Sequence, residues 1–212
     1  MKNIIDAMQW RYATKQFDAE KKLSPAQLET LLETLRLAPS SFGLQPWKFI
    51  VVTNDEVRAK LREVAWNQPQ ITDASHLIVF AIKKDIDDAL VVEYMQLVST
   101  IRGRSIEDLK GFSEMLNGVI QARSVEENKD WATRQVYLSL GFLLAAAAVE
   151  GIDACPIEGF VSSKQIDEIL GLEAMGLESK VLAAVGFRLP SDQAAQNPRV
   201  RFPKEEVFIE VK

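Results

Sequence analysis

The spacing of hydrophobic residues along this chain predicts helices that alternate with short strands. Between Leu28 and Leu35 the leucines recur at the three-and-four spacing of one helix face. Ser24 can cap this helix, Pro25 occupies its first position, and Gln27 completes a capping box. The sequence therefore predicts a helix that begins at residue 25 and is ended by the proline at position 39.

Other segments follow the same two patterns. The run 76–83, HLIVFAIK, is apolar nearly throughout, as expected for a strand that is covered on both faces. Further strands are predicted at 48–53, 153–157 and 180–187, with a strand-like segment at the end of the tail. Further helices are predicted near residues 4–8, at 55–65, at 130–150 and from Ser162 onwards.

Residues 85–129 are predicted to form a charged, helical excursion, with glycines at 103, 111 and 118. Its apolar content is too thin for a core of its own, so we expect an insertion within a single domain, 1–212, that ends in an arm at 197–212. Strands that alternate with helices indicate an α/β sheet protein. Alternation alone does not fix the direction of the strands.

Composition narrows the class of protein. The 212 residues are 47% hydrophobic and 26% charged, with a net charge of −5, so nothing overall attracts nucleic acid or an anionic membrane. The apolar run 136–149 is shorter than the roughly 20 residues of a membrane span, and we expect a buried or interface helix. One cysteine excludes an intrachain disulfide, and the first residues lack a secretory signal, so a cytoplasmic protein is expected.

The usual catalytic side chains are scarce. No glycine-rich phosphate motif follows a strand, and one histidine (His76) with one cysteine (Cys155) gives too few ligands for zinc. Ser40 and Ser41 lack a histidine base, and Cys155 lies in an apolar strand where a buried, inert thiol is expected. No metal site is expected, and if the chain is an enzyme, a cofactor carries its chemistry.

Basic residues occur as two pairs at opposite ends of the chain. Arg11 and Lys15 are four residues apart, and Arg199 and Arg201 are two apart, so the latter project to one side of an extended segment. Each pair alone is more often a solvated surface pair. Together, in an acidic protein, they would make a basic pocket for a phosphate monoester.

Three loops carry amides, aromatic residues or glycine where a simple turn would suffice. The junction 39–47, PSSFGLQPW, has the residues to hold a flat polar ligand. The segment 66–70, WNQPQ, has amides that suit the edge of a heterocycle, although such residues are common in loops. In 155–160, CPIEGF, the glycine would let a backbone N–H approach a ligand, and a plain turn is the alternative.

These segments occur in the order of a known family. RYATKQFD, APSSFGLQPWKFIVV, NQPQITDASHLIVF, WATRQVYLSLGFLL, GIDACPIEGF and NPRVRFP span nearly the whole chain apart from 85–129. The chain resembles the FMN-dependent nitroreductases, especially the oxygen-insensitive bacterial NAD(P)H nitroreductases and flavin reductases. The resemblance implies an α+β fold with a mostly antiparallel sheet flanked by helices. It also implies a homodimer with swapped C-terminal tails and FMN at its interface.

The resemblance also implies site residues, carried over by position. Arg11, Arg199 and Arg201 would hold the FMN phosphate, and Lys15 would stabilise charge at the pyrimidine edge of the flavin. The other implied cofactor-binding residues are Tyr12, Ala13, Thr14, Asn67, Gln70, Pro156, Ile157, Glu158 and Gly159, with Pro39, Ser40, Ser41, Gly43 and Gln135 from the partner chain. Phe42 and Trp66 would line the substrate pocket.

Three departures from the family pattern bear on this site. Ala13 stands where relatives often have a serine near the phosphate, so one hydrogen bond would be missing. Phe42 and Gly43 replace smaller or amide residues, which affects substrate preference. Gln70 stands where some relatives have a second lysine, which changes the charge beside the flavin.

The implied reaction is a two-electron transfer by a ping-pong scheme. A hydride would pass from NAD(P)H to the flavin N5, and a nitroaromatic, a quinone or a related flat acceptor would then take the electrons. The same fold also hosts free-flavin reduction, enone reduction and dehalogenation. A non-catalytic flavin-binding protein and a ligand-free dimerisation module are the alternatives outside enzymes.

Overall fold

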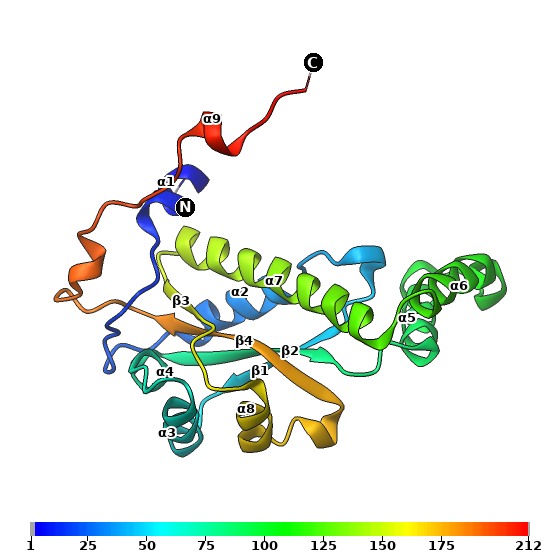
Figure 1. Cartoon of the computed structure of the whole chain (residues 1–212), viewed down its shortest axis with the longest axis horizontal. Coiled ribbons are helices and arrows are strands. Elements are labelled where there is room, and N and C mark those ends of the chain that lie inside the picture. The colour runs from blue at the N-terminus through cyan, green and yellow to red at the C-terminus, as the bar shows by residue number, and fades with distance from the viewer. Residues whose placement is uncertain (1–2, 212) are drawn as a thin grey trace.

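The fold is a sheet between two layers of helices (Figure 1). The computed structural model describes residues 3–211, so Met1, Lys2 and Lys212 of the expected domain and arm lie outside it. Four strands, β1 (Trp47–Val52), β2 (His76–Lys83), β3 (Asp153–Ile157) and β4 (Leu177–Gly186), form a sheet of order β1-β2-β4-β3. Every neighbouring pair is antiparallel. The predicted α+β class is confirmed, and strand alternation with helices did not mean a parallel sheet.

Strand β2 shows why the sheet has two covered faces. Ile78, Phe80 and Ile82 join the hydrophobic core on one face, whereas Leu77 and Val79 join the core on the other. Successive side chains of a strand point to opposite faces, so an uninterrupted apolar run requires helices on both sides. All five of these side chains are fully buried. The sequence prediction of a strand covered on both faces is confirmed.

The helices divide between the two faces of the sheet. One layer contains α2 (Pro25–Arg36) and α7 (Val125–Val149), and α7 contacts all four strands (Figure 1). The other layer contains α3 (Asp55–Val64), α4 (Gln70–Asp73) and α8 (Ser163–Leu170). Helix α1 (Ile4–Trp10) packs on α7, and short 3-10 turns occupy Ser41–Gly43, Glu173–Met175 and Gln193–Ala195.

The long helix begins earlier than the apolar pattern predicted. Ser124 caps α7 and forms a capping box with Glu127, so the helix starts at Val125 and not at residue 130. By length and composition alone, α7 is a candidate for a membrane span, unlike the shorter run 136–149. In the structure its buried residues pack on the sheet, as in a core helix of a globular protein.

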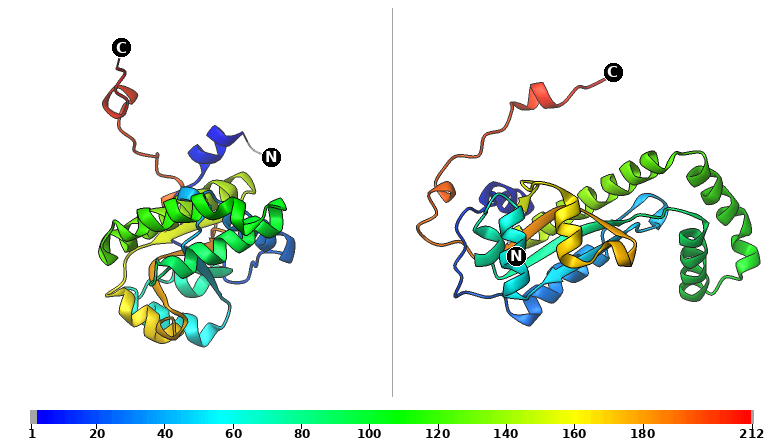
Figure 2. Two further views of the ribbon diagram at one scale, coloured as in Figure 1. Left: turned by 90° about the vertical axis from the view of Figure 1, so that its right-hand side faces the viewer. Right: turned by 60° about the horizontal axis from the view of Figure 1, so that its bottom comes forward.

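The excursion is a helical hairpin that adds to the main core. It comprises α5 (Asp88–Arg102) and α6 (Ile106–Gln121), which pack together at one end of the molecule (Figure 2). Gly103 ends α5 in the left-handed conformation, which glycine adopts at little cost. Leu90, Met95 and Leu116 are buried in the same cluster as α7. The helical prediction is confirmed, and the sparse apolar residues serve the shared core.

The predicted strand at the end of the tail is wrong. The tail contains one helical turn, α9 (Lys204–Val207), and its remaining described residues belong to no strand. The arm leaves the body of the molecule, and Phe202, Phe208 and Ile209 are exposed (Figures 1 and 2). Alternating hydrophobic residues cannot form a strand without a neighbouring strand that supplies hydrogen bonds.

A buried arginine holds the segment that follows α3. Arg58 is 2% exposed, and its guanidinium donates to the carbonyl oxygens of Ile71 (2.7 Å), Ala74 (2.6 Å) and Ser75 (3.3 Å). These carbonyls belong to α4 and to the two residues that connect α4 to β2. The bonds compensate for the loss of water around the charge. Arg58 thereby fixes α4, which begins at Gln70.

Candidate functional site

The N-terminal segment 11–17 lies along the edge of the sheet. Ala13 bridges Ala154 of β3 in a parallel sense, and Phe17 bridges Arg188. In an extended segment alternate side chains point to opposite sides. The sequence RYATK therefore separates into two faces, one with residues 11, 13 and 15 and the other with residues 12 and 14.

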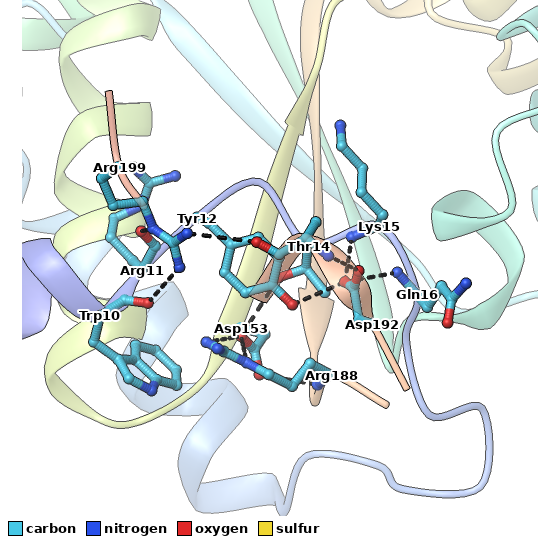
Figure 3. A network of polar contacts seen from close by, with 11 residues as sticks. Trp10, Arg11, Tyr12, Thr14, Lys15, Gln16, Asp153, Arg188, Asp192 and Arg199 are labelled. Atoms are coloured by element: carbon cyan, nitrogen blue, oxygen red, sulfur yellow. Dashed lines mark hydrogen bonds and ion pairs between the residues drawn. The ribbon is translucent and has the colours of Figure 1, made fainter. Parts of the chain in front are cut away.

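Burial confirms the separation of these two faces. Tyr12 and Thr14 are buried, whereas Arg11 is half-buried and Lys15 is exposed. Figure 3 shows the Tyr12 hydroxyl directed toward Asp192 and Thr14 toward Asp153, while Lys15 extends away from this network. The side chains of Tyr12 and Thr14 therefore serve the protein interior, and their cofactor-binding role stays a prediction that could involve only their backbone.

Three arginines from both ends of the chain converge beside this segment. The pKa of Arg11 is lowered, chiefly by burial and then by the positive charges of Arg201 and Arg199. Arg199 donates from Nε to the carbonyl oxygen of Arg11 at 3.0 Å, across 188 residues of sequence. Within residues 3–211, none of the three takes part in an ion pair with a carboxylate. The result is a cluster of positive charge without a counter-charge.

Lys15, Gln70 and Cys155 adjoin this cluster. Burial raises the pKa of the Cys155 thiol, and the charges of Lys15 and Arg11 and the amide of Gln70 oppose this rise. Cys155 is also only 2% exposed, so its burial and raised pKa are both in keeping with the expected inert thiol. Gln70 is 5% exposed, yet its Oε1 has no hydrogen-bond partner among the described residues. A buried acceptor without a donor is unusual in a native protein.

Beneath the segment lies a carboxylate that the sequence analysis missed. Asp192 Oδ2 accepts from the Tyr12 hydroxyl (2.8 Å), the Lys15 N–H (2.9 Å) and the Gln16 N–H (3.1 Å), as Figure 3 shows. Burial alone would raise the pKa of Asp192, but these hydrogen bonds outweigh burial and lower it. Asp192 therefore stays ionised near neutral pH.

A second carboxylate, Asp153, forms an ion pair with another arginine, Arg188. Arg188 donates from Nε to Asp153 Oδ1 at 2.7 Å, and its guanidinium lies 4.2 Å from the Trp10 ring and 4.5 Å from the Tyr12 ring. Thr14 donates to the same Asp153 oxygen at 3.4 Å. The sequence offered little signal for these contacts, because the partners lie 35 to 180 residues apart. For Asp192, the one local signal was its position as the N-cap of a 3-10 turn.

The junction 39–47 and Gln135 form a second group in the same chain. Ser41 N–H donates to Gln135 Oε1 at 2.9 Å, and Gln45 N–H donates to Ser40 Oγ at 3.0 Å. Phe42 and Gln45 have φ angles of 59° and 45°, which residues other than glycine rarely adopt. Backbone strain of this kind is concentrated at functional sites.

The two groups are well separated within one chain. In Figure 1 the segment that follows α2 lies beside α7, right of the centre of the view, whereas the segment 11–17 runs down the left edge, beyond the C-terminal end of α7. A groove of about 710 Å³ runs between α2, β1 and α5, and its lining includes Gln45, Trp47 and Tyr94 but none of the clustered arginines. Gly43 lies against Tyr94, so a larger residue would collide there.

The loop after β3 packs against the loop after α3. Gly159 O accepts from Gln68 Nε2 at 2.7 Å, and a Cβ at Gly159 would lie 2.6 Å from the Trp66 ring. Trp66 and Asn67 both have positive φ, at 52° and 53°, and Asn67 Oδ1 accepts from Arg62 Nε at 2.9 Å. The structure thus brings segments 66–68 and 156–159 together, with the exposed Trp66 ring on the glycine.

Glu158 of this loop accepts a short hydrogen bond from the Tyr137 hydroxyl on α7. Burial and this bond to the carboxylate raise the pKa of Tyr137 to about 12. Among residues 3–211, no group of three or more His, Cys, Asp or Glu side chains is placed to hold a metal ion. The polar groups at the site suit an organic anion and a ring with hydrogen-bonding edges.

The Tyr137 contact predicts a pH dependence of stability. An unfolded tyrosine has a pKa near 10, so the folded state binds this proton more tightly between pH 10 and 12. The contribution is complete below pH 10 and is lost as pH rises toward 12. In Tyr137→Phe the free energy of unfolding should fall less steeply with pH above 10, measured by urea titration at several pH values. Tyr12 has a similar shift in both proteins, so parallel curves would contradict the prediction.

Comparison with known proteins identifies the family of this chain. The family model described as "Nitroreductase family" matches residues 8–187. A protein of Staphylococcus haemolyticus that is provisionally named an NAD(P)H nitroreductase is 34% identical over 215 residues, covering 97% of this chain and 95% of its own.

Solved structures show the same fold. A provisionally named nitroreductase of Bacillus subtilis has a TM-score of 0.86 at 22% identity and covers 98% of each chain. One from Exiguobacterium sibiricum, in complex with FMN, has a TM-score of 0.83 at 23% identity and covers 100% of this chain and 98% of its own. The match of the family model over most of the sequence, on this antiparallel sheet, places the chain in the nitroreductase family.

Proposed function

We propose that this chain is an FMN-dependent oxidoreductase that passes two electrons from NAD(P)H to nitroaromatics, quinones or related flat acceptors. The observation that carries the proposal is the convergence of Arg11, Arg199 and Arg201 beside Lys15. A phosphate monoester would supply the missing negative charge. Family membership and the FMN complex of a structural relative support the same cofactor.

The residues present fit FMN by a second criterion. Among the residues that the structure describes, the buried Gln70 Oε1 has no donor, and Gln70 lies beside Cys155, whose thiol also feels the charge of Lys15. The pyrimidine edge of a flavin offers ring N–H groups and carbonyl oxygens, which match an amide acceptor and an ammonium donor. Asn67 and the backbone of 156–159 would provide further polar contacts.

Each protein group has a distinct task in this reading. The arginine cluster would bind the phosphate, and Lys15 would stabilise negative charge at the pyrimidine edge after reduction. When bound, FMN supplies hydride acceptance and two-electron transfer. Trp66 and Phe42, both exposed, would contact the flat nucleotide or acceptor. No side chain is required as an acid, since solvent can protonate the acceptor.

A homodimer explains why the candidate residues form two separate groups. If one cofactor contacts both groups, the junction 39–43 and Gln135 must come from a second copy. Tyr137, Leu138 and Phe142 are each about 40% exposed on α7, and the C-terminal arm presents apolar residues to solvent. Surfaces of this kind mark association sites. We therefore propose that α7 and the arm bury each other's apolar residues in the dimer.

Deletion of residues 202–212 tests the dimer. The parent should sediment at twice the 23.8 kDa of one chain, and the deleted protein, which retains Arg199 and Arg201, should dissociate at least tenfold more readily. The reason is the loss of apolar area that the arm covers. Sedimentation velocity over a range of concentrations measures both. A parent that remains monomeric at 100 μM would refute the shared site.

The phosphate assignment predicts selective loss of affinity. Arg11→Ala and Arg201→Ala should each weaken FMN binding by about 10- to 100-fold, because each removes charge-assisted hydrogen bonds of about 1.5–3 kcal/mol. Riboflavin lacks the phosphate, so its affinity should change less than about threefold. Fluorescence titration of the flavin measures both ligands. Arg102→Ala, an exposed arginine at the end of α5, is the control and should match the parent.

The proposed activity predicts a kinetic pattern. NAD(P)H oxidation by the FMN-loaded protein, with menadione or nitrofurazone as acceptor, should give parallel double-reciprocal lines when both substrates are varied. One open site then serves the donor and the acceptor in turn. Intersecting lines would require both to be bound together, and absence of turnover with bound FMN would favour a flavin-binding protein.

A further inference from the structure

The loop that follows β4 forms hydrogen bonds with the backbone of segment 10–16, which carries the cations Arg11 and Lys15. Leu189 N–H donates to Gln16 O at 2.9 Å, and Asp192 Oδ2 accepts from the N–H groups of Lys15 and Gln16. Further along, Arg199 Nη2 donates to Trp10 O at 3.3 Å, in addition to its bond to the Arg11 carbonyl. Both ends of segment 10–16 are thus bound to residues 189–199.

Arg199 and Arg201 differ in what their guanidinium groups contact. Arg199 donates to the carbonyls of Trp10, Arg11, Ala194 and Asn197, so four of its five N–H groups face backbone oxygens. Arg201 is exposed and donates to the carbonyl of Val200. The two arginines looked equivalent in sequence, but only Arg201 keeps most of its donors for an outside anion.

Asp192 lies on the opposite side of the segment from the Lys15 ammonium. It is 3% exposed, and it accepts three hydrogen bonds at one oxygen and one from Ala194 N–H at the other (3.0 Å). Figure 3 shows the Lys15 side chain leaving the segment away from this carboxylate. Asp192 therefore acts on the backbone of Lys15 and not on its charge by direct contact.

We propose that Asp192 is a positioning residue of the flavin site: it fixes the backbone at Lys15 and Gln16, and so sets where Arg11 and Lys15 present their positive charges. This inference rests on the proposed FMN function. An anion cannot itself ligate a phosphate, so any contribution of Asp192 to FMN affinity must pass through the residues that it holds. A displacement of about 1 Å at a charged group is enough to weaken its interaction substantially.

The sign of the effect separates positioning from simple electrostatics. As a bare negative charge near a phosphate and a reduced flavin, Asp192 opposes both, and its removal would strengthen FMN binding and raise the midpoint potential. As a positioning residue, Asp192 has the opposite effect. Its removal displaces Arg11 and Lys15, which weakens FMN binding and lowers the potential, because Lys15 no longer stabilises the reduced form.

Asp192→Asn in the full-length, FMN-loaded protein tests the inference. The neutral amide of asparagine has the same shape as the carboxylate. Its NH2 group, however, must face donors that one of the two carboxylate oxygens now accepts from. We expect FMN to bind about tenfold more weakly, riboflavin to be weakened as well, and reduced FMN to lose about tenfold more affinity than oxidised FMN. That last factor corresponds to a midpoint potential about 30 mV lower. Flavin fluorescence titration and redox titration against a reference dye measure these quantities.

Two further variants complete the design. Ser191→Ala removes an exposed neighbour that donates to Gln16 Oε1, and it should lie within twofold of the parent in both measurements. Tyr12→Phe removes one donor to Asp192 and should shift both quantities in the same direction as Asp192→Asn, but less. It carries the test if Asp192→Asn does not fold.

Each outcome has a distinct meaning. Weaker FMN and riboflavin binding with a lower potential supports positioning. An unchanged or raised affinity and potential, or a loss of thermal stability alone, overturns it and leaves the proposed function intact. A parent protein that binds no FMN overturns the proposed function and this inference with it.

Discussion

Positive charge held together with no carboxylate partner among residues 3–211 is the condition on which the candidate site depends. Two unit charges about 4 Å apart near a protein surface interact by roughly 4 kcal/mol, so guanidinium groups in one cluster repel one another. The effect is visible in Arg11, whose pKa is lowered by burial and by Arg201 and Arg199. An arrangement of this kind is unfavourable without a ligand and becomes favourable when an anion binds among the charges. The cluster is therefore better explained by binding than by stability.

Backbone hydrogen bonds oppose this repulsion. The alternation in RYATK directs Tyr12 and Thr14 inward, where Asp192 and Asp153 accept their hydroxyl hydrogens. The same alternation directs Arg11 and Lys15 outward. One face of a five-residue stretch is thereby anchored by buried carboxylates, while the other face presents cations. The carboxylates stabilise the position of the cations without forming ion pairs with Arg11 or Lys15.

Sequence reasoning predicted the parts of the fold that depend on local patterns. Helix α2 followed from the Ser24 capping box, and β2 from its apolar run, because both signals are contained within a few residues. Strand direction was not contained in them, and the resemblance to a family supplied it. The tail, with alternation but no neighbouring strand among residues 3–211, was misread as a strand. Alternation indicates which side chains share a face and not whether hydrogen-bond partners exist.

The candidate site divides along the same line. Arg11, Lys15, Arg199 and Arg201 could be selected from the sequence, because clustered cations in an acidic chain are unusual. Asp192 could not, because its partners lie about 176 to 180 residues away and its own surroundings resemble an ordinary turn. The sequence analysis also treated Arg199 and Arg201 alike. Their spacing indicates that both project to one side of the chain, but not which of their N–H groups already donate to backbone carbonyls. The sequence therefore predicted which side chains carry positive charge, but not which of their donors are already bonded to the backbone.

The strained junction shows how the two halves of the site would meet. Positive φ costs a residue with a Cβ about 1–2 kcal/mol, yet Phe42 and Gln45 both adopt it within a single chain. The bonds from Ser41 N–H to Gln135 and from Gln45 N–H to Ser40 stabilise this conformation without help from another subunit. The cation cluster is likewise assembled within one chain, by residues 189–199 on segment 10–16. Each half is therefore formed within a single chain, and in the proposed dimer the free energy of association would not have to order either loop. A cofactor that contacts both halves would then be bound between two rigid surfaces, which limits the conformational entropy lost on binding.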